Sequence, residues 1–362
     1  MQKLKLVLDY RMSANSGIGV YLTKISEVLD QKKHLEIRLL DSSSRAYKAK
    51  NISFKSRIYS LKEQLVFPFI IPSADFFWSP HYNVPILPIR AKHRVVTIHD
   101  VCHLALSDQL SFFQRLYARI MIRLAVKFSD VIITVSEFSK SEIVRFTGTK
   151  KEIHVVHNGV GLVDHSLGEE ESQILLDSYI LYVGNVKPHK NLGRALLAFE
   201  SLAEKYPDYK LVIVGKKENF INGDDDFLNK AVLNESVLFT GYVDDSVLGR
   251  YYKGATLLLF PSLYEGFGLP PLEAQSYGCA VACSNAASLP EVCGDAALYF
   301  DPYDVEDISA KLEALLESEQ LRSQLRIKGF ENVKRFSWEK ASNTIFEIIS
   351  SYSEKKNRYS SR

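Results

Sequence analysis

The sequence contains few cysteines and no long hydrophobic run. Four cysteines occur in 362 residues, and none belongs to a C-x-x-C motif or to the two pairs of a zinc site. This spacing excludes the usual redox and zinc motifs and favours reduced, mostly buried thiols. No uncharged apolar run approaches the roughly 18 residues of a membrane-spanning helix. The N-terminal apolar stretch, broken by Lys5 and closed by Asp9, is too short for a signal peptide. We therefore expect a cytoplasmic protein, either soluble or peripherally attached to a membrane.

The net charge is small, but it is unevenly divided along the chain. Residues 1–160 contain 24 basic and 13 acidic residues, and residues 161–362 contain 21 and 30, so the halves carry +11 and −9. A basic half can meet an anionic lipid or phosphate surface, which an acidic half avoids. Because no nucleic-acid-binding motif accompanies this charge, we expect no nucleic acid partner.

Short apolar runs alternate with longer helical patterns along the whole chain. They occur at 5–10, 34–40, 94–100 and 130–136, and again at 179–184, 209–215, 236–241 and 255–260. Runs that are apolar on both faces and separated by helix-length segments are typical of parallel sheets covered by helices. Because a single core stops growing at roughly 250–300 residues, the sequence predicts an α/β protein with two doubly wound domains.

A polar segment separates the two blocks of strands. Residues 160–178 combine glycines with three consecutive glutamates and few aromatic residues, as expected of a linker. We predict an N-terminal domain at 1–165, a C-terminal domain at 166–345, and a helix end with a frayed polar tail at 346–362. One helix is expected from about Val305 to Lys328, followed by another amphipathic segment.

The segment 256–284 is the most informative for function. A strand precedes the string EGFGLPPLEA, in which Glu265 lies in a loop and two prolines precede Glu273. Proline suits the first turn of a helix, and the free N–H groups and dipole at that end attract anions. Glycines in the loop allow the backbone to approach a ligand closely. The string therefore predicts an anion-binding loop at the carboxyl end of a strand.

Taken with other strings, this segment resembles the retaining glycosyltransferases of family 4. The similarity lies in the E-x7-E pair Glu265 and Glu273, in VGNVKPHKNL (183–192), VVHNGV (155–160), SNAASLPEVCGDAALYFDP (284–302) and SGIGVY (16–21), in the family's order. The TIHD string and the GxxxPxKN form are most similar to bacterial surface-polysaccharide mannosyl- and rhamnosyltransferases. The resemblance implies the GT-B fold: two Rossmann-like domains, the first mainly for the acceptor, the second mainly for the nucleotide sugar, and a reaction in the cleft.

Carried over to the matching positions, the resemblance implies a donor site. Glu273 is expected to bind the ribose hydroxyls and Glu265 the hydroxyls of the donor sugar. A carboxylate can accept two hydrogen bonds from a vicinal diol, so the residue type fits that role, and neither glutamate need be a general base. The remaining expected donor contacts in this loop are Gly266, Phe267, Gly268 and Leu269.

Lys190 is the cation that we expect at the donor diphosphate. It follows a strand and a short loop, with Asn191 as the expected N-cap of an amphipathic helix. A cation there stabilises the charge that develops on the leaving diphosphate. Members of the family often have an arginine early in this loop, where this sequence has Asn185; we count Asn185 among the donor-binding residues and leave the second cation unassigned.

In the N-terminal half, the resemblance points to two glycines and a histidine. Gly17 and Gly19 follow the first strand and precede a helix, where the family's loop approaches the donor phosphates; a lone G-x-G is weak evidence by itself. His99 ends the strand 94–100, at the ligand edge of an α/β sheet. The resemblance implies that His99 contacts the transferred sugar. It joins Glu265 and Lys190 as our expected catalytic residues.

Two further residues are expected on the acceptor side. Asp100 either orients the His99 ring or binds acceptor, and His81, in SPHYNVP, is a weaker candidate.

Basic residues recur at every fourth position in one helical segment. Arg115, Arg119, Arg123 and Lys127 share a helix face. Like charges at this spacing repel by a few tenths of a kcal/mol per pair. The stripe is therefore either an ordinary solvated face or a surface for an anionic partner, which would be a membrane or a lipid-pyrophosphate acceptor.

Acidic residues at 224–226 contain a D-x-D, which in another glycosyltransferase fold holds a divalent ion. Their turn-like context, NGDDDF, favours a solvated turn, and Asp244 and Asp245 are expected at a helix start. We therefore predict no metal and no cofactor, with the nucleotide diphosphate sugar as co-substrate.

The sequence thus predicts a retaining, metal-independent hexosyltransferase that extends a lipid-linked surface polysaccharide such as an O-antigen of lipopolysaccharide. It would act at the inner face of the plasma membrane with GDP-mannose as the first-choice donor. Rhamnosyl, glucosyl or galactosyl transfer are alternatives within the family. A non-catalytic nucleotide-binding scaffold and a nucleotide-sugar epimerase of the same architecture are the alternatives outside it. Front-face attack and a covalent intermediate both remain open.

Overall fold

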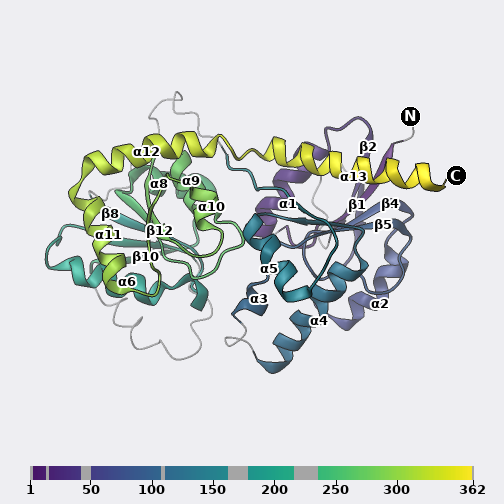
Figure 1. The fold of residues 1–362 in the computed structure, drawn as a ribbon, viewed down its shortest axis with the longest axis horizontal. Helices are drawn as coiled ribbons and strands as arrows, with labels where there is room; N and C mark the ends of the chain where they lie inside the picture. The colour runs from purple at the N-terminus through teal and green to yellow at the C-terminus, as the bar shows by residue number, and fades with distance from the viewer. Residues whose placement is uncertain are drawn as a thin grey trace. The chain divides into compact units, whose positions relative to one another are not determined.

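The protein folds into two compact units, each a parallel sheet covered by helices (Figure 1). The computed structural model describes residues 3–13, 16–41, 50–106, 111–161, 178–215 and 235–360. Unit 1 comprises residues 1–159 and 336–362, and unit 2 comprises residues 160–335. The predicted α/β class and the predicted pair of doubly wound domains are confirmed.

Unit 1 contains, in its described residues, a seven-stranded parallel sheet in the order β3-β2-β1-β4-β5-β6-β7. Its strands are β1 (Leu4–Asp9), β2 (Leu35–Asp41), β3 (Lys50–Ser53), β4 (Ala74–Ser79), β5 (Ala91–Thr97), β6 (Val131–Thr134) and β7 (Ile153–Val155). The strand order reverses between β1 and β4. Doubly wound sheets bind ligands at such a reversal, outside the carboxyl ends of the strands.

Helices cover both faces of this sheet: α1 (Ser16–Leu29), α2 (Leu61–Ile70), α3 (Cys102–Ala105), α4 (Phe112–Phe128), α5 (Glu137–Thr147) and α13 (Trp338–Ser360). Helix α13 corrects the predicted domain boundaries. It packs on α1, and its Ala341, Ile345 and Ile349 are buried in the same core as β1. Residues 336–345 therefore belong to unit 1 rather than to the C-terminal domain, and the expected frayed tail is helical to Ser360.

Unit 2 contains a six-stranded parallel sheet in the order β10-β9-β8-β11-β12-β13 among the residues described. Its strands are β8 (Tyr179–Val183), β9 (Lys210–Val214), β10 (Val237–Gly241), β11 (Leu257–Phe260), β12 (Ala280–Ser284) and β13 (Leu298–Phe300). Its helices are η2 (Pro188–Lys190), α6 (Leu192–Ala203), α8 (Asp245–Gly254), α9 (Leu269–Ser276), α10 (Leu289–Cys293), α11 (Val305–Glu317) and α12 (Glu319–Val333). Here the order reverses between β8 and β11.

The eight strands that the apolar runs predict are all present, but the sequence pattern misses others. The most important is β4, which lies in the middle of the unit 1 sheet. Its Phe76, Phe77 and Trp78 are completely buried, yet the strand lacks the Val, Ile and Leu residues that mark the other runs. The single helix expected from about Val305 is in fact two helices, because the Ser318 hydroxyl accepts a hydrogen bond from the Leu321 N–H and starts α12.

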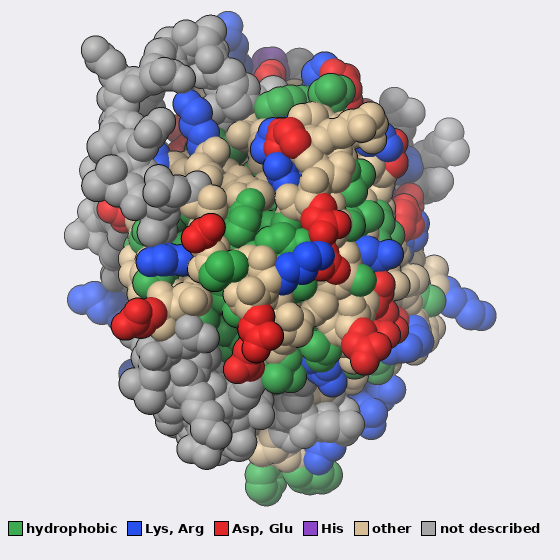
Figure 2. All heavy atoms as spheres, turned by 90° about the vertical axis from the view of Figure 1, so that its left-hand side faces the viewer, with side chains coloured by type: hydrophobic (Ala, Val, Ile, Leu, Met, Phe, Trp, Pro, Cys, Tyr) green, Lys and Arg blue, Asp and Glu red, His purple; other side chains and the backbone are tan. Residues whose placement is uncertain are grey.

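The charge asymmetry becomes larger when it is counted by unit. Unit 1 contains 29 basic and 16 acidic residues, a net charge of +13. Unit 2 contains 16 basic and 27 acidic residues, a net charge of −11. Figure 2 shows a face of unit 2 on which acidic and basic side chains are interspersed. Elsewhere in the same unit, Lys205, just after α6, lies 2.6 Å from Glu313 and 2.7 Å from Glu317 of α11. Such pairs locally offset part of the acidic excess of unit 2.

All four cysteines are free thiols, three of them buried, as their spacing predicts. Within the described ranges, no helix is both long and apolar enough to cross a membrane.

Candidate functional site

In unit 2, two of the expected donor residues, Lys190 and Glu265, meet where the strand order reverses. Lys190 lies in the turn η2 after β8, and Glu265 lies in the loop after β11. The Lys190 Nζ is 2.5 Å from the Glu265 Oε1, and the two side chains are only 18% and 14% exposed. The structure therefore brings together two residues 75 positions apart that the sequence could assign only separately.

Backbone hydrogen bonds hold these two loops in place. The Leu263 N–H donates to the His189 carbonyl over 2.8 Å. The Asn191 side chain donates to the carbonyls of Pro261 and Pro302. Asn191 occupies the N-cap position of α6, as predicted, but its side chain does not cap the helix. Its amide instead ties the loop after β8 to the segments that follow β11 and β13.

The glycine-containing loop is shaped by close packing on α10. Gly268 has φ 105°, and a Cβ there would lie 2.7 Å from the Leu289 Cδ2, so only glycine fits without a shift. Leu269 begins α9, with proline in its first turn as expected. The Ser288 hydroxyl lies 2.9 Å from the carbonyl oxygens of both Glu265 and Phe267. Phe267 is buried, so its expected donor contact is limited to its backbone.

Glu273 lies in α9 and is held by a tyrosine from a neighbouring helix. The Tyr252 hydroxyl donates to the Glu273 Oε2 over 2.9 Å, and the Tyr252 ring stacks on that of Tyr277. Burial raises the pKa of Glu273, and the Tyr252 hydrogen bond opposes that rise. One carboxylate oxygen is thus fixed by the protein. Sequence reasoning missed Tyr252 and Ser288, because neither lies in a recognisable string with the glutamate that it contacts.

Asn185 follows Gly184 at the carboxyl end of β8, on the same edge of the sheet as Lys190. Arg194, in the first turn of α6, is a cation near this loop that the sequence analysis did not consider. Its Nη1 donates to the Asn191 Oδ1 over 3.0 Å, and its guanidinium stacks on the Tyr303 ring.

In unit 1, the two glycines lie inside a helix rather than before it. Gly17 and Gly19 belong to the first turn of α1, which begins at Ser16, whereas the sequence analysis placed both in the preceding loop. A Cβ at Gly19 would lie 2.4 Å from the Ser13 carbonyl oxygen, whereas Gly17 has open space around it. Gly19 is therefore required by the tight entry of the chain into α1, whereas among the described residues nothing requires glycine at position 17.

His99 lies just beyond β5, at the carboxyl edge of the unit 1 sheet. Its Nε2 is 3.1 Å from the Pro80 carbonyl, and its ring packs edge-on against Tyr21 at 4.8 Å. Because a carbonyl only accepts, the Nε2 carries the proton. Burial lowers the pKa of His99 to about 4, so the ring is neutral at pH 7.

Asp100 does not orient the His99 ring by a hydrogen bond in the described structure. Its Oδ1 accepts from the Cys102 N–H over 2.9 Å at the start of α3, and Pro80 holds the histidine instead. His81 follows β4, and its ring lies 3.9 Å from that of Tyr82. Burial, with smaller contributions from His99 and His103, lowers the pKa of His81 to about 3.

Helix α4 presents both basic and apolar side chains to solvent. Arg119, Arg123 and Lys127 are exposed and Arg115 is half-buried, so the predicted stripe exists. Phe112 and Phe113 at the start of α4, and Leu116 and Ile120 next to the arginines in sequence, are 65%, 79%, 44% and 47% exposed. This mixed face is more apolar than an ordinary solvated helix face.

No group of three or more potential metal ligands occurs in the parts of the chain that the structure describes. The acidic residues at 224–226 lie outside those parts.

Two Rossmann-like units, the second with a lysine–glutamate pair at its strand reversal, are the architecture of the GT-B fold. Two family descriptions match the chain: "Glycosyl transferases group 1" at residues 169–332 and "Glycosyltransferase Family 4" at residues 16–163. The chain is 33% identical over 279 residues to O-antigen chain mannosyltransferase B of Escherichia coli, covering 74% of this chain and 71% of that protein. The chain therefore belongs to the glycosyltransferase family that includes this O-antigen mannosyltransferase.

Other relatives and structures agree with this assignment. The chain is 29% identical to the O-antigen chain mannosyltransferase RfbU of Salmonella typhimurium over 62% of this chain and 60% of that protein. It is 30% identical to the serotype-specific mannosyltransferase WbdA of Escherichia coli, but spans only 28% of that protein. Sucrose-phosphate synthase from Thermosynechococcus elongatus is similar in fold, with a TM-score of 0.78 and 16% identity; the match covers 98% of this chain and 100% of that one. Anabaena HepE, solved with UDP and glucose, has a TM-score of 0.77 at 16% identity, covering 96% and 100%.

Proposed function

We propose that this glycosyltransferase moves mannose from GDP-mannose to a hydroxyl of a growing, lipid-linked surface polysaccharide, with retention of configuration. The observation that supports a donor site most directly is the Lys190–Glu265 pair beside the N-terminus of α9. The mannose assignment is supported by the relatives, several of which are O-antigen mannosyltransferases. Rhamnosyl, glucosyl and galactosyl transfer remain the alternative reactions of this proposal.

The unit 2 residues supply what departure of a diphosphate requires. Lys190 and the N-terminus of α9 place positive charge where the leaving group becomes more anionic. Glu265 and Glu273 accept hydrogen bonds from hydroxyls of the donor sugar and the ribose. Since a diphosphate needs charge stabilisation more than it needs a proton, the proposal includes neither a general acid nor a metal ion. Addition of a chelator is therefore expected to leave the transfer rate unchanged.

A donor panel tests this function. At 100 times its Kd, a bound donor stabilises a protein by about 2.7 kcal/mol, which shifts the melting temperature by several degrees. We expect GDP-mannose to raise the melting temperature more than dTDP-rhamnose or UDP-hexoses do, and to support transfer to a mannosylated lipid acceptor. Donor binding without turnover, with every donor and acceptor, would instead indicate a scaffold. Conversion of the donor without acceptor would indicate an epimerase.

We further propose that α4 attaches unit 1 to an anionic membrane. The arginines of α4 attract anionic lipid headgroups, and Phe112 and Phe113 supply apolar surface that can enter the headgroup region. The basic charge of unit 1 as a whole supports the same orientation toward an anionic surface.

Replacing Arg115, Arg119 and Arg123 together by Gln is expected to weaken binding to vesicles by at least about 10-fold, since each basic residue near such a surface contributes about 1 kcal/mol. Sedimentation with vesicles containing one-third phosphatidylglycerol measures this loss, and the loss should disappear in high salt. The control replaces Arg326 and Lys328 of α12, and Lys334 just after it, by Gln, with the same change in charge. Equal vesicle binding by the two variants would refute the role of α4, and donor protection should be unchanged in both.

A further inference from the structure

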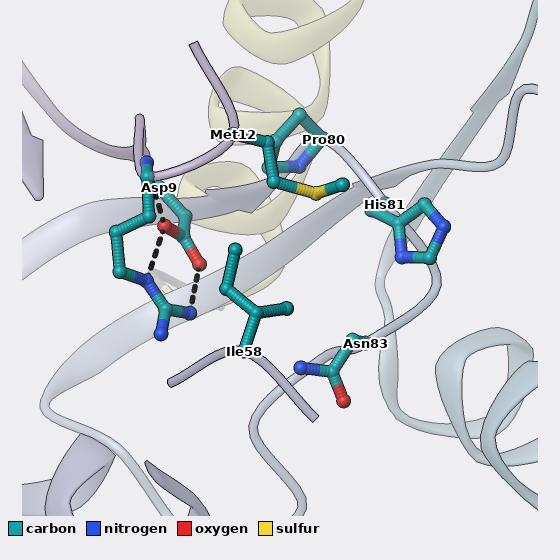
Figure 3. A pocket seen from close by; sticks show the side chains of 7 residues that line it. Asp9, Met12, Ile58, Pro80, His81 and Asn83 are labelled. Carbon is teal, nitrogen blue, oxygen red and sulfur yellow. Dashed lines mark hydrogen bonds and ion pairs between the residues drawn. The ribbon is translucent and has the colours of Figure 1, made fainter. Parts of the chain in front are cut away.

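One buried group of charges in unit 1 is paired within the protein. Arg11 lies 2.6 Å from Asp9 and 2.9 Å from Glu63, and the three side chains, here called the Arg11 network, are at most 9% exposed. The hollow beside this network, whose lining includes Asp9, Met12 and His81, has room for about one water molecule (Figure 3). The network is therefore part of the fold of unit 1 rather than a ligand site.

In unit 2, by contrast, two tyrosine rings pack beside a carboxylate that is only partly used. Tyr252 lies in α8 and Tyr277 directly follows α9; their ring centroids are 5.8 Å apart and their planes are inclined by 22°. Gly249 makes room for this stack, because a Cβ there would lie 2.4 Å from the Tyr277 hydroxyl oxygen. Tyr252 is 1% exposed, so close packing fixes the position of its ring.

The Tyr252 hydroxyl donates to Glu273 and favours its ionised form. Its oxygen is 2.9 Å from the Glu273 Oε2, and an ionised carboxylate can only accept. Burial, followed by the charge of Glu273, raises the pKa of Tyr252 well above its ordinary value, so the hydroxyl keeps its proton. Burial raises the pKa of Glu273, the Tyr252 hydrogen bond lowers it, and Asp245 raises it to a lesser extent.

The other carboxylate oxygen, Oε1, is left for a ligand. Among the described residues it has no hydrogen-bond partner, and it is not enclosed, so it reaches solvent. Because the Tyr252 hydrogen bond holds Oε2, the carboxylate cannot turn away without losing that bond. A ligand that covers Oε1 without offering a donor leaves a charged oxygen unpaired, which is costly.

Glu273 also lies at a suitable place for the ribose of a nucleotide. Helix α9 begins at Leu269, and Glu273 follows one helical turn later. The N-terminus of α9 is the part that faces the diphosphate in the proposed donor site, and the ribose is the next group along a nucleotide. A ribose offers two neighbouring hydroxyl donors, which a carboxylate can accept.

We propose that Tyr252 is the positioning residue through which Glu273 selects nucleotides that carry ribose hydroxyls. Tyr252 holds Oε2, and Oε1 accepts a hydrogen bond from the ribose. The class of donor is therefore a ribonucleoside diphosphate sugar, since a nucleotide without these hydroxyls covers Oε1 and leaves it unpaired. The inference rests on the proposed function and makes it more specific, because it concerns the nucleotide rather than the sugar or the acceptor.

Calorimetric titration of the full chain with GDP, UDP and their 2′,3′-dideoxy analogues tests the proposal. For the nucleotide that it prefers, the wild type should bind the dideoxy analogue at least about 10-fold more weakly, because a hydrogen bond to a charged group is lost. Tyr252→Phe should bind the ribonucleotide at least about five-fold more weakly than the wild type does, but the analogue within about twofold, so that most of the selection disappears.

Tyr299→Phe is the matched control. The Tyr299 hydroxyl donates to the Gly294 carbonyl over 2.6 Å, so this variant also removes a tyrosine hydrogen bond of unit 2, but one that does not involve Glu273. It should keep the selection of the wild type. Adding Tyr252→Phe to Glu273→Gln should change the selection no further, since the two residues act together.

Three results would overturn the proposal: equal selection by Tyr252→Phe and the wild type, equal weakening of ribonucleotide and analogue in Tyr252→Phe, or a wild type that binds ribonucleotides no better than their analogues. The second result would indicate a merely structural role. If only UDP and its analogue bind, GDP-mannose is wrong as the donor, but the selection is still measured. Absence of sugar transfer would refute the proposed function without changing these nucleotide affinities.

Discussion

The Glu265→Gln variant is expected to transfer sugar at least about 100-fold more slowly than the wild type. Hydrogen bonds to a charged group contribute about 1.5–3 kcal/mol each, and in the proposed site Glu265 accepts two of them from the donor sugar, which the substitution would weaken. Each 1.36 kcal/mol lost from transition-state stabilisation is a tenfold loss of rate. Glutamine keeps the size and planarity of the side chain, so the loop held by Ser288 should stay in place.

The measurement is kcat/KM with a saturating acceptor, together with circular dichroism to confirm folding. Glu313→Gln is the matched control, because Glu313 also pairs with a lysine of unit 2, at 2.6 Å, but in an exposed position on α11. It should retain transfer within about twofold, since exposed pairs contribute little. Near-normal transfer by Glu265→Gln would remove Glu265 from the site.

The Arg11→Met variant is expected to lower the free energy of unfolding of unit 1 by about 3–5 kcal/mol. This is the usual cost of removing one partner from a buried ion pair, because the carboxylates left behind remain buried without a counter-charge. Arg11 also packs on the Phe54 and Phe67 rings, at 4.4 and 5.1 Å, and methionine preserves only part of that contact. Urea unfolding followed by circular dichroism measures the loss.

Arg38→Met is the control for this prediction. Arg38 pairs with Glu36 over 2.7 Å, but both side chains are about 30% exposed, so the expected loss is below about 1 kcal/mol. Combining Arg11→Met with Asp9→Asn and Glu63→Gln should recover part of the stability, since no uncompensated charge is then buried. If Arg11→Met and Arg38→Met were equally stable, the network would have little effect on folding.

Much of the fold could be predicted because parallel sheets impose a strong local pattern. The apolar runs mark eight strands correctly, and the prolines of EGFGLPPLEA mark the start of α9. Strand β4 was missed because its burial is carried by aromatic residues rather than by an aliphatic run. The assignment of residues 336–345 was wrong because an amphipathic helix shows that it packs somewhere, but not against which sheet.

The candidate site was predicted in part. Lys190, Glu265 and Glu273 could be named from their strings; the structure pairs Lys190 with Glu265 and places Glu273 in α9 beside Tyr252. The role of Asp100 as an orienting group could not be decided, because the hydrogen bonds of a side chain depend on neighbours from other segments. Tyr252, Ser288 and the Arg11 network belong to no motif and emerge only after folding.

The sequence by itself determined the class of fold, the family, and the residue types available for the donor, because strand and helix periods and short motifs are local properties. Tertiary structure decided which of those residues meet. It paired Lys190 with Glu265 and fastened Glu273 to Tyr252. It also enclosed Asp9, Arg11 and Glu63 at the strand reversal of unit 1. The physical reason is that charge and hydrogen bonding act over a few ångströms in space, and only the packed sheets bring distant segments that close.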